Sequence, residues 1–187
     1  CESDIQRAAS WGLDHLRLPV DYFLFESDSL PGVFNEDGLK YIDNCISWCR
    51  KYGLNTVLDL HHAPGYFFGN GDRNLLFTDA GMQKRFLDIW QFFALRYMNE
   101  GENLVFELLN ELVQDNSDSW NILWQKAAEL IHGIDPDRRI IVGGNRWNSV
   151  DELKNLVVSD NQNIWYTFHM YHPMIFTHQA AKWEEAG

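Results

Sequence analysis

The chain has 187 residues, of which 45% are hydrophobic and 22% are charged, as is typical of a globular domain. Its 27 acidic against 15 basic residues give a formal net charge of −12, which disfavours nucleic acid as a partner because binding it requires a basic surface. All apolar runs are well short of the ~18 residues that span a bilayer, so the sequence predicts no membrane segment and no membrane partner.

Strand-like segments recur along the chain. Five apolar runs, rich in β-branched residues, have the character of strands buried on both faces. They occupy Asp14–Val20, Asn55–His61, Asn103–Asn110, Arg139–Gly144 and Ile164–His169.

Helical segments fill the intervals between these runs. A helix at Glu2–Trp11 precedes the first strand, and amphipathic helices with polar N-caps follow. The later helices are Glu36–Tyr52 capped by Asn35 and ended by Gly53, Asp79–Asn99 capped by Thr78, Asp118–His132 capped by Ser117 and followed by Gly133, and a short helix at Val150–Val158.

The alternation of strands and helices predicts a parallel sheet, either a barrel or an open doubly wound sheet. No glycine-rich phosphate loop follows a predicted strand, which removes the main signal for a nucleotide-binding sheet. The long connections Asp21–Phe34 and His62–Phe77 follow strand ends, where barrel enzymes build their sites. We therefore predict an α/β fold that is a partial (β/α)8 barrel with about five of eight strands. A whole barrel needs about 250 residues, so residues 1–187 are expected to form a single, incomplete catalytic domain.

Polar and titratable residues lie at the predicted C-terminal end of every strand. In chain order they are Arg17, then His61 and His62, then Asn110 and Glu111, then Asn145, Trp147 and Asn148, and finally His169 and Tyr171. In a parallel barrel all of these ends share one mouth, so side chains from separate strands are expected to converge there.

Within this set, Glu111 is suited to general acid–base catalysis, and the amide of Asn110 is suited to binding a substrate hydroxyl. Side-chain alternation places Glu107 on the same side of its strand as Glu111. A lone carboxylate inside an apolar barrel is costly. The sequence therefore predicts a contact between Glu107 and Arg17.

A metal site is the rival interpretation, because histidines are frequent at the strand ends. Adjacent strand residues point to opposite faces, so His61 and His62 are expected to be poor ligands for one ion. The spacing of Cys45 and Cys49 within a helix favours buried thiols, and no Gly-x-Ser-x-Gly elbow is present. We therefore expect neither a metal ion nor another cofactor.

Four motifs in order carry a resemblance to glycoside hydrolase family 5, also called cellulase family A, and within it to the clostridial cellulase C type of endoglucanase. They are His15–Tyr22, Leu58–Gly65, Phe106–Glu111 and Phe168–Tyr171. The resemblance covers nearly the whole chain, which would run from the helix before the second strand of the barrel to just past the sixth.

The resemblance implies hydrolysis of β-linked glucan with retention of configuration, with Glu111 as the acid/base. It also implies a set of substrate-binding residues: Arg17, His61, His62, Asn110, His169 and Tyr171. In the family the nucleophile is a second Glu at the end of the seventh strand, so the isolated chain is expected to be inactive unless a complementing barrel fragment is present. A polysaccharide substrate favours an extracellular location.

Other functions remain open at the level of the sequence. A β-mannanase or an exo-acting β-1,3-glucanase would use the same scaffold, because substrate choice lies in loops and in strands outside this chain. A carbohydrate-binding fragment without catalysis and a metal-dependent barrel hydrolase are the alternatives from other classes.

Overall fold

The computed structural model describes residues 1–67, 69 and 74–181. Its strands form one parallel five-stranded sheet in the order β1-β2-β3-β4-β5. The strands are β1 (His15–Asp21), β2 (Asn55–His62), β3 (Leu104–Glu107), β4 (Ile140–Gly143) and β5 (Ile164–Thr167). All five predicted strands are therefore present, paired in chain order.

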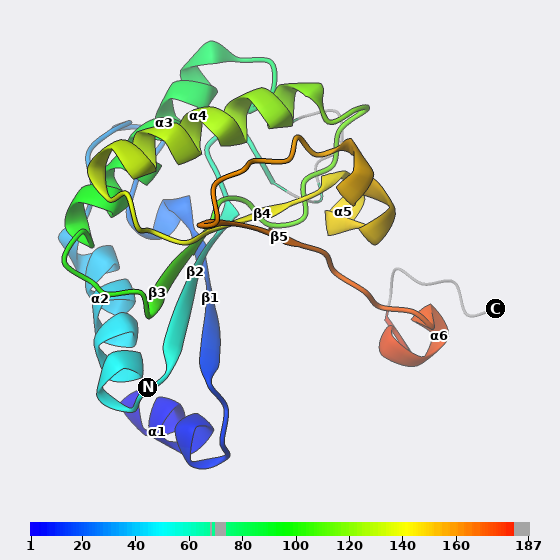
Figure 1. The fold of residues 1–187 in the computed structure, drawn as a ribbon. Helices are drawn as coiled ribbons and strands as arrows, with labels where there is room; N and C mark the ends of the chain where they lie inside the picture. The colour runs from blue at the N-terminus through cyan, green and yellow to red at the C-terminus, as the bar shows by residue number, and fades with distance from the viewer. Residues whose placement is uncertain (68, 70–73, 182–187) are drawn as a thin grey trace.

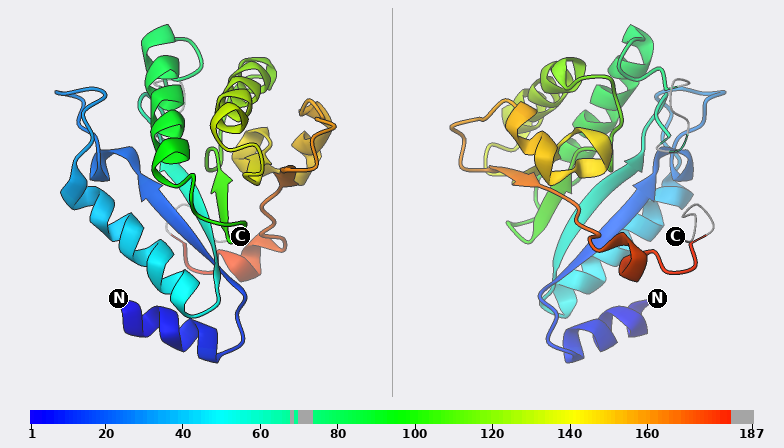
Figure 2. Two further views of the ribbon diagram at one scale, coloured as in Figure 1. Left: turned by 60° about the vertical axis from the view of Figure 1, so that its left-hand side comes forward. Right: turned by 90° about the vertical axis from the view of Figure 1, so that its right-hand side faces the viewer.

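Six α-helices and two 3-10 helices accompany this sheet in the described part of the chain. They are α1 (Glu2–Ser10), η1 (Tyr22–Leu24), α2 (Glu36–Lys51), α3 (Ala80–Arg96), α4 (Asp118–Ile134), α5 (Asn145–Asn148), η3 (Val150–Asn155) and α6 (Met174–Thr177). Helices α2, α3 and α4 cover one face of the sheet, while α6 lies apart from them at the end of the chain (Figures 1 and 2). No helix in the described part of the chain is long and apolar enough to cross a membrane.

The helix ends differ from the sequence analysis in several places, and Ser117 lies at the start of α4 without a side-chain capping bond. Asn35 caps α2 as predicted, accepting a hydrogen bond from the Asp37 amide. Asp79, not Thr78, caps α3, because its carboxylate accepts from the Met82 amide. Helix α4 runs through Gly133 to Ile134, and the segment expected to be a short helix at Val150–Val158 is the 3-10 helix η3.

The strands are also bounded differently from the prediction. Strand β3 ends at Glu107 instead of Asn110, and β5 ends at Thr167 instead of His169. Strand β2 extends one residue further, and its pairing with β1 shifts where Val20 pairs with Leu60 but Asp21 pairs with His62. His61 is thus the extra residue of a β-bulge, a feature that redirects side chains locally.

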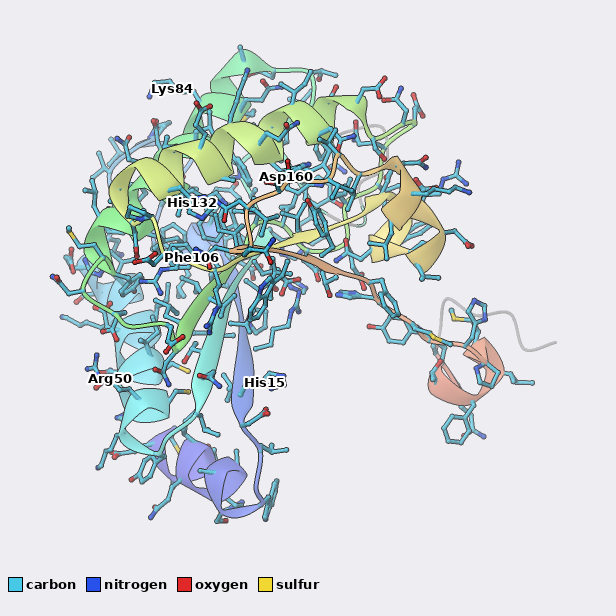
Figure 3. The ribbon with its side chains drawn as sticks, in the orientation of Figure 1. His15, Arg50, Lys84, Phe106, His132 and Asp160 are labelled. Carbon is cyan, nitrogen blue, oxygen red and sulfur yellow. The ribbon has the colours of Figure 1, made fainter. Side chains whose placement is uncertain are left out.

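The core lies between the sheet and its covering helices, around Phe106, which is labelled in Figure 3. Trp90, Trp120 and Trp124 are all buried there, and burying each indole contributes roughly 4–6 kcal/mol by area. The indole nitrogen of Trp90 donates to the Leu108 carbonyl at 3.3 Å, and that of Trp120 donates to the Gly143 carbonyl at 2.9 Å. These two bonds fix the chain where β3 and β4 end.

The cysteines follow the prediction for the helical pair. Cys45 and Cys49 are buried thiols on α2, and Cys1 is an exposed thiol. Hydrogen bonding from Cys45 lowers the pKa of the Cys49 thiol.

Candidate active site

A charged cluster lies beneath the C-terminal end of the sheet, where strands β1, β2 and β3 are adjacent. Arg17 of β1 binds Glu107 of β3 through Nε and Nη2 at 2.7 and 2.8 Å. The same guanidinium lies 3.0 Å from Asp59 Oδ2 on β2. Asp59 and Glu107 are partners in the strand register, and both are buried. The predicted contact between Glu107 and Arg17 is confirmed, in the bidentate geometry that makes such pairs strong.

Two further side chains close this cluster into a ring of hydrogen bonds. Arg17 Nη2 donates to Asn110 Oδ1 at 3.0 Å, and Asn110 Nδ2 lies 3.5 Å from His61 Nε2. His61 Nδ1 in turn lies 2.8 Å from Asp59 Oδ2. The ring fixes the orientation of the Asn110 amide, because a guanidinium can only donate.

The charges of this cluster favour retention of a proton. One cation, Arg17, faces two carboxylates, Asp59 and Glu107. Burial raises the pKa of Asp59, and the charge of Glu107 adds to that rise. The hydrogen bond to Asp59 raises the pKa of His61 despite the opposing effect of burial. The Asp59–His61 pair therefore holds a proton to higher pH than either group would alone.

Glu111 lies after the end of β3 and leaves the strand geometry altogether. Its φ of 43° is in the left-handed region, which is uncommon for a residue with a side chain. The Tyr66 hydroxyl donates to its carbonyl at 2.7 Å. Because β3 ends four residues earlier, the expectation that Glu111 follows the alternation of Glu107 is wrong, although Glu111 still reaches the same end of the sheet.

The Glu111 carboxylate meets the imidazole of His169, which follows β5. Glu111 Oε1 lies 2.6 Å from His169 Nδ1, and both side chains are partly exposed, at 14% and 18%. Asn148 Nδ2 lies 3.4 Å from His169 Nε2 on the other side of the ring. A partly exposed carboxyl, oriented by an imidazole and adjacent to Asn110, has the geometry of a proton donor and acceptor.

His62 and Tyr171 lie at the margins of this group. His62 Nδ1 lies 2.5 Å from Asp21 Oδ1, and its ring stacks on Phe67. The rings of His61 and His62 contact edge to face with centroids 5.2 Å apart. The expectation that they point to opposite faces is therefore wrong, because the bulge at His61 breaks the strand alternation. Tyr171 is 45% exposed and contacts the ring of His169.

The seven predicted catalytic and substrate-binding residues thus form one continuous group at one end of the sheet. Two residues that support it, Asp59 and Tyr66, have no role predicted from the sequence, whereas Asn148 was expected at the strand ends and contacts His169 there. Asp59 carried a usable signal, since it is a charged residue inside an apolar strand. Among the described residues, no group of three His, Cys, Asp or Glu side chains could hold a metal ion.

Comparison with known proteins assigns the family. A model described as Cellulase (glycosyl hydrolase family 5) matches residues 1–186. The chain belongs to glycosyl hydrolase family 5. This member is 52% identical over 186 residues to Endoglucanase C of Acetivibrio thermocellus, covering 100% of this chain and 54% of the relative. It is 38% identical to Cellodextrinase A of Ruminococcus flavefaciens over 97% of this chain and 54% of that protein.

Solved structures of the family confirm the fold. Endoglucanase Cel5A from Thermotoga maritima matches with a TM-score of 0.83 at 28% identity, over 99% of this chain and 58% of that one. The Clostridioides difficile cellulose synthase subunit Z matches with a TM-score of 0.84 at 30% identity and the same coverage. This family 5 chain therefore forms part of a (β/α)8 barrel, as predicted, and spans about half the length of the curated relatives it matches.

Proposed function

We propose that residues 1–187 form part of the catalytic domain of an endo-β-glucanase that hydrolyses β-1,4 or mixed-linkage glucan with retention of configuration. The observation that carries the proposal is the partly exposed Glu111 carboxyl bonded to His169 at the end of a parallel sheet. The family and the 52% identity to an endoglucanase support it.

In this proposal Glu111 is the general acid that protonates the leaving oxygen and then the general base that activates water. His169 engages Oε1 of Glu111, which leaves Oε2 to carry the transferred proton. Asn110 presents its amide to a sugar hydroxyl, and its orientation is set by Arg17. His61 contributes a further polar contact along the same sugar.

The outer binding residues would be His62 and Tyr171, whose rings lie at the two margins of the site. Sugar faces pack well against rings, and the exposed ring of Tyr171 is available for such a contact. The substrate is a neutral glucan, which the net charge of −12 tolerates, and no cofactor is required by the two-carboxylate mechanism.

A retaining glycosidase requires a second carboxyl group about 5–5.5 Å from the first. Asp59 and Glu107 are poor candidates, because both are buried and bonded to Arg17. We place the nucleophile on a complementing portion of the barrel that adds strands beside β1 and β5. Exposed apolar side chains on and after β5, such as Trp165 and Phe168, fit such a neighbour.

Complementation tests this proposal. The chain would be co-expressed with the parts of Acetivibrio thermocellus Endoglucanase C that precede and follow its matched region, and reducing sugar released from mixed-linkage β-glucan would be measured. Activity is expected from the co-expressed pair and not from the chain alone. Release of sugar by the chain alone, abolished by Glu111→Gln, would show that both carboxyls are already present.

β-1,3-glucan and β-mannan are tested as alternative substrates in the same assay. Relatives include a probable glucan 1,3-beta-glucosidase A of Aspergillus fumigatus at 32% identity, and a Thermotoga maritima Cel5A structure holds mannotriose. A panel of cellulose oligomers, β-1,3-glucan and β-mannan would therefore be compared. Faster cleavage of mannan or β-1,3-glucan than of β-1,4-glucan would overturn the proposed substrate. If the co-expressed pair migrates more slowly in a gel containing glucan but does not cleave it, a carbohydrate-binding role would be favoured.

A further inference from the structure

Asn148, which follows β4, contacts the imidazole of His169 on the side opposite Glu111. Its side chain is fully buried, and Nδ2 lies 3.4 Å from His169 Nε2. Its backbone carbonyl also accepts a hydrogen bond from the His169 amide at 2.8 Å. One residue therefore fixes both the backbone and the ring of His169.

The atoms on either side of His169 determine where its proton lies. A neutral imidazole has one N–H donor and one acceptor nitrogen. An ionised Glu111 can only accept, so His169 Nδ1 must carry the proton in their 2.6 Å contact. His169 Nε2 is then the acceptor, and it faces an amide nitrogen that can only donate.

We propose that Asn148 is a positioning residue that holds His169 as the neutral tautomer protonated on Nδ1, so that the imidazole donates to Glu111. The role rests on the acid/base function proposed for Glu111. A neutral donor keeps Oε1 occupied without placing a full positive charge beside a carboxyl that must take up a proton in each cycle. An imidazolium there would favour the ionised carboxylate and oppose that step.

The backbone conformation of Asn148 and the glycine at position 143 hold its side-chain amide in place. Asn148 has a φ of 55°, a conformation that asparagine tolerates better than most residues. A Cβ at position 143 would lie 2.4 Å from Asn148 Oδ1, so glycine at 143 is what admits the side chain. Among the described residues, Oδ1 has no hydrogen-bond partner. The buried amide thus leaves its carbonyl unpaired while Nδ2 faces the imidazole.

A second imidazole in the protein shows the same arrangement and supplies an internal reference. His61 has a carboxylate oxygen at Nδ1 and the Asn110 amide nitrogen at Nε2. It draws these contacts from β2 and the end of β3, and it has no bond to Asn148. A change confined to His169 can therefore be separated from a general loss of structure.

The test is the tautomer of His169, read from long-range ¹H–¹⁵N correlation spectra of the ¹⁵N-labelled 187-residue chain near neutral pH. The expected pattern is that of a neutral ring protonated on Nδ1. A ring protonated on Nε2, or an imidazolium, would overturn the proposal. Because no substrate is present, failure of the proposed hydrolase activity would leave this result unchanged.

Two variants separate positioning from packing. Asn148→Asp keeps the size and the tolerance of positive φ but replaces the donor by an acceptor, so His169 is expected to acquire a proton on Nε2. Asn148→Gly removes the donor that faces Nε2, so the ring is expected to keep its proton on Nδ1 and to become free to take up a second proton on Nε2. Asn44→Asp, on the exposed face of α2, adds the same charge and is expected to leave His169 unchanged.

The signals of His61 report whether each variant is folded. If the His61 signals disappear in Asn148→Asp, that variant is unfolded. The spectra of the wild-type chain and of Asn148→Gly then decide whether Asn148 positions His169. An unchanged His169 pattern in a folded Asn148→Asp or Asn148→Gly chain would show that Asn148 is only a packing residue.

Discussion

Two carboxylate–imidazole pairs lie at the same end of this sheet and are built differently. Asp59–His61 has a carboxylate that is fully buried and bonded to Arg17. Glu111–His169 has a carboxylate that is partly exposed, and no Arg or Lys side chain in the described part of the chain forms an ion pair with it. Burial beside a fixed cation makes the first pair a scaffold. Partial exposure leaves the second able to exchange a proton with a substrate.

The largest expected effect is the loss of catalytic activity when Glu111 is replaced, and its absence would remove the distinction between the two pairs. In the complemented barrel, Glu111→Gln is expected to lower kcat/KM for β-glucan about 10²–10⁴-fold, because proton transfer to the leaving oxygen is lost. Steady-state assays would measure this, with Glu129→Gln on the exposed face of α4 as the matched control. Equal activity of the two variants would remove Glu111 from the mechanism.

The scaffold pair is tested by removing its cation. Arg17→Leu leaves Asp59 and Glu107 buried without a counter-charge, and such a loss typically costs about 3–5 kcal/mol of unfolding free energy. Urea denaturation of the 187-residue chain would measure it. Arg50→Leu removes an exposed pair with Glu100 and is expected to cost at most about 1 kcal/mol. Similar losses in both variants would contradict a scaffold role for Arg17.

A smaller loss of stability is expected when Tyr66 is changed, because its hydroxyl bonds to the backbone carbonyl of Glu111. Tyr66→Phe removes the hydroxyl that donates to the Glu111 carbonyl, at a net cost of about 0.5–1.5 kcal/mol. Thermal unfolding would show the loss, with Tyr41→Phe on the exposed side of α2 as control. The complemented Tyr66→Phe enzyme should also lose activity, since Glu111 is no longer held at positive φ; full activity would show that the bond is dispensable.

The smallest expected effect is a pH dependence confined to the scaffold pair. The pKa of His61 is raised in the folded chain, so its contribution to stability is fully present below the unfolded pKa of about 6.5 and is lost as pH rises through the folded value. Asp59, with its raised pKa, acts in the same direction from about pH 3.9 upward.

Urea midpoints between about pH 6 and 8 would therefore fall for the wild-type chain and fall less for His61→Gln. His15→Gln, an exposed histidine at the start of β1, is the matched control and should retain the wild-type slope. A wild-type slope in His61→Gln would show that the pair does not hold the proton.

The parts of this site that could be predicted from the sequence are those that follow regular strand geometry. The contact between Arg17 and Glu107 follows from alternation inside apolar strands and from the cost of an unpaired buried charge. The parallel sheet follows from the alternation of strand and helix patterns. In both cases a local pattern determines the outcome.

The parts that could not be predicted depend on departures from that geometry. The bulge at His61 arises from the pairing of β1 with β2, which neither strand's own pattern reveals. The positive φ of Glu111 goes with a hydrogen bond from Tyr66, which is 45 residues away in the chain. The cap at Asp79 could not be distinguished from one at Thr78, because both residue types cap helices and the fold decides between two neighbours.

The extra residue in β2 has a geometric consequence. With strict alternation one strand end would offer its two last side chains to opposite sides of the sheet, and a second imidazole would have to come from another strand. The register shift instead lets a single strand supply two adjoining imidazoles. Deleting that residue would cost the protein a neighbouring pair of rings while leaving the hydrogen-bonded ladder below it intact.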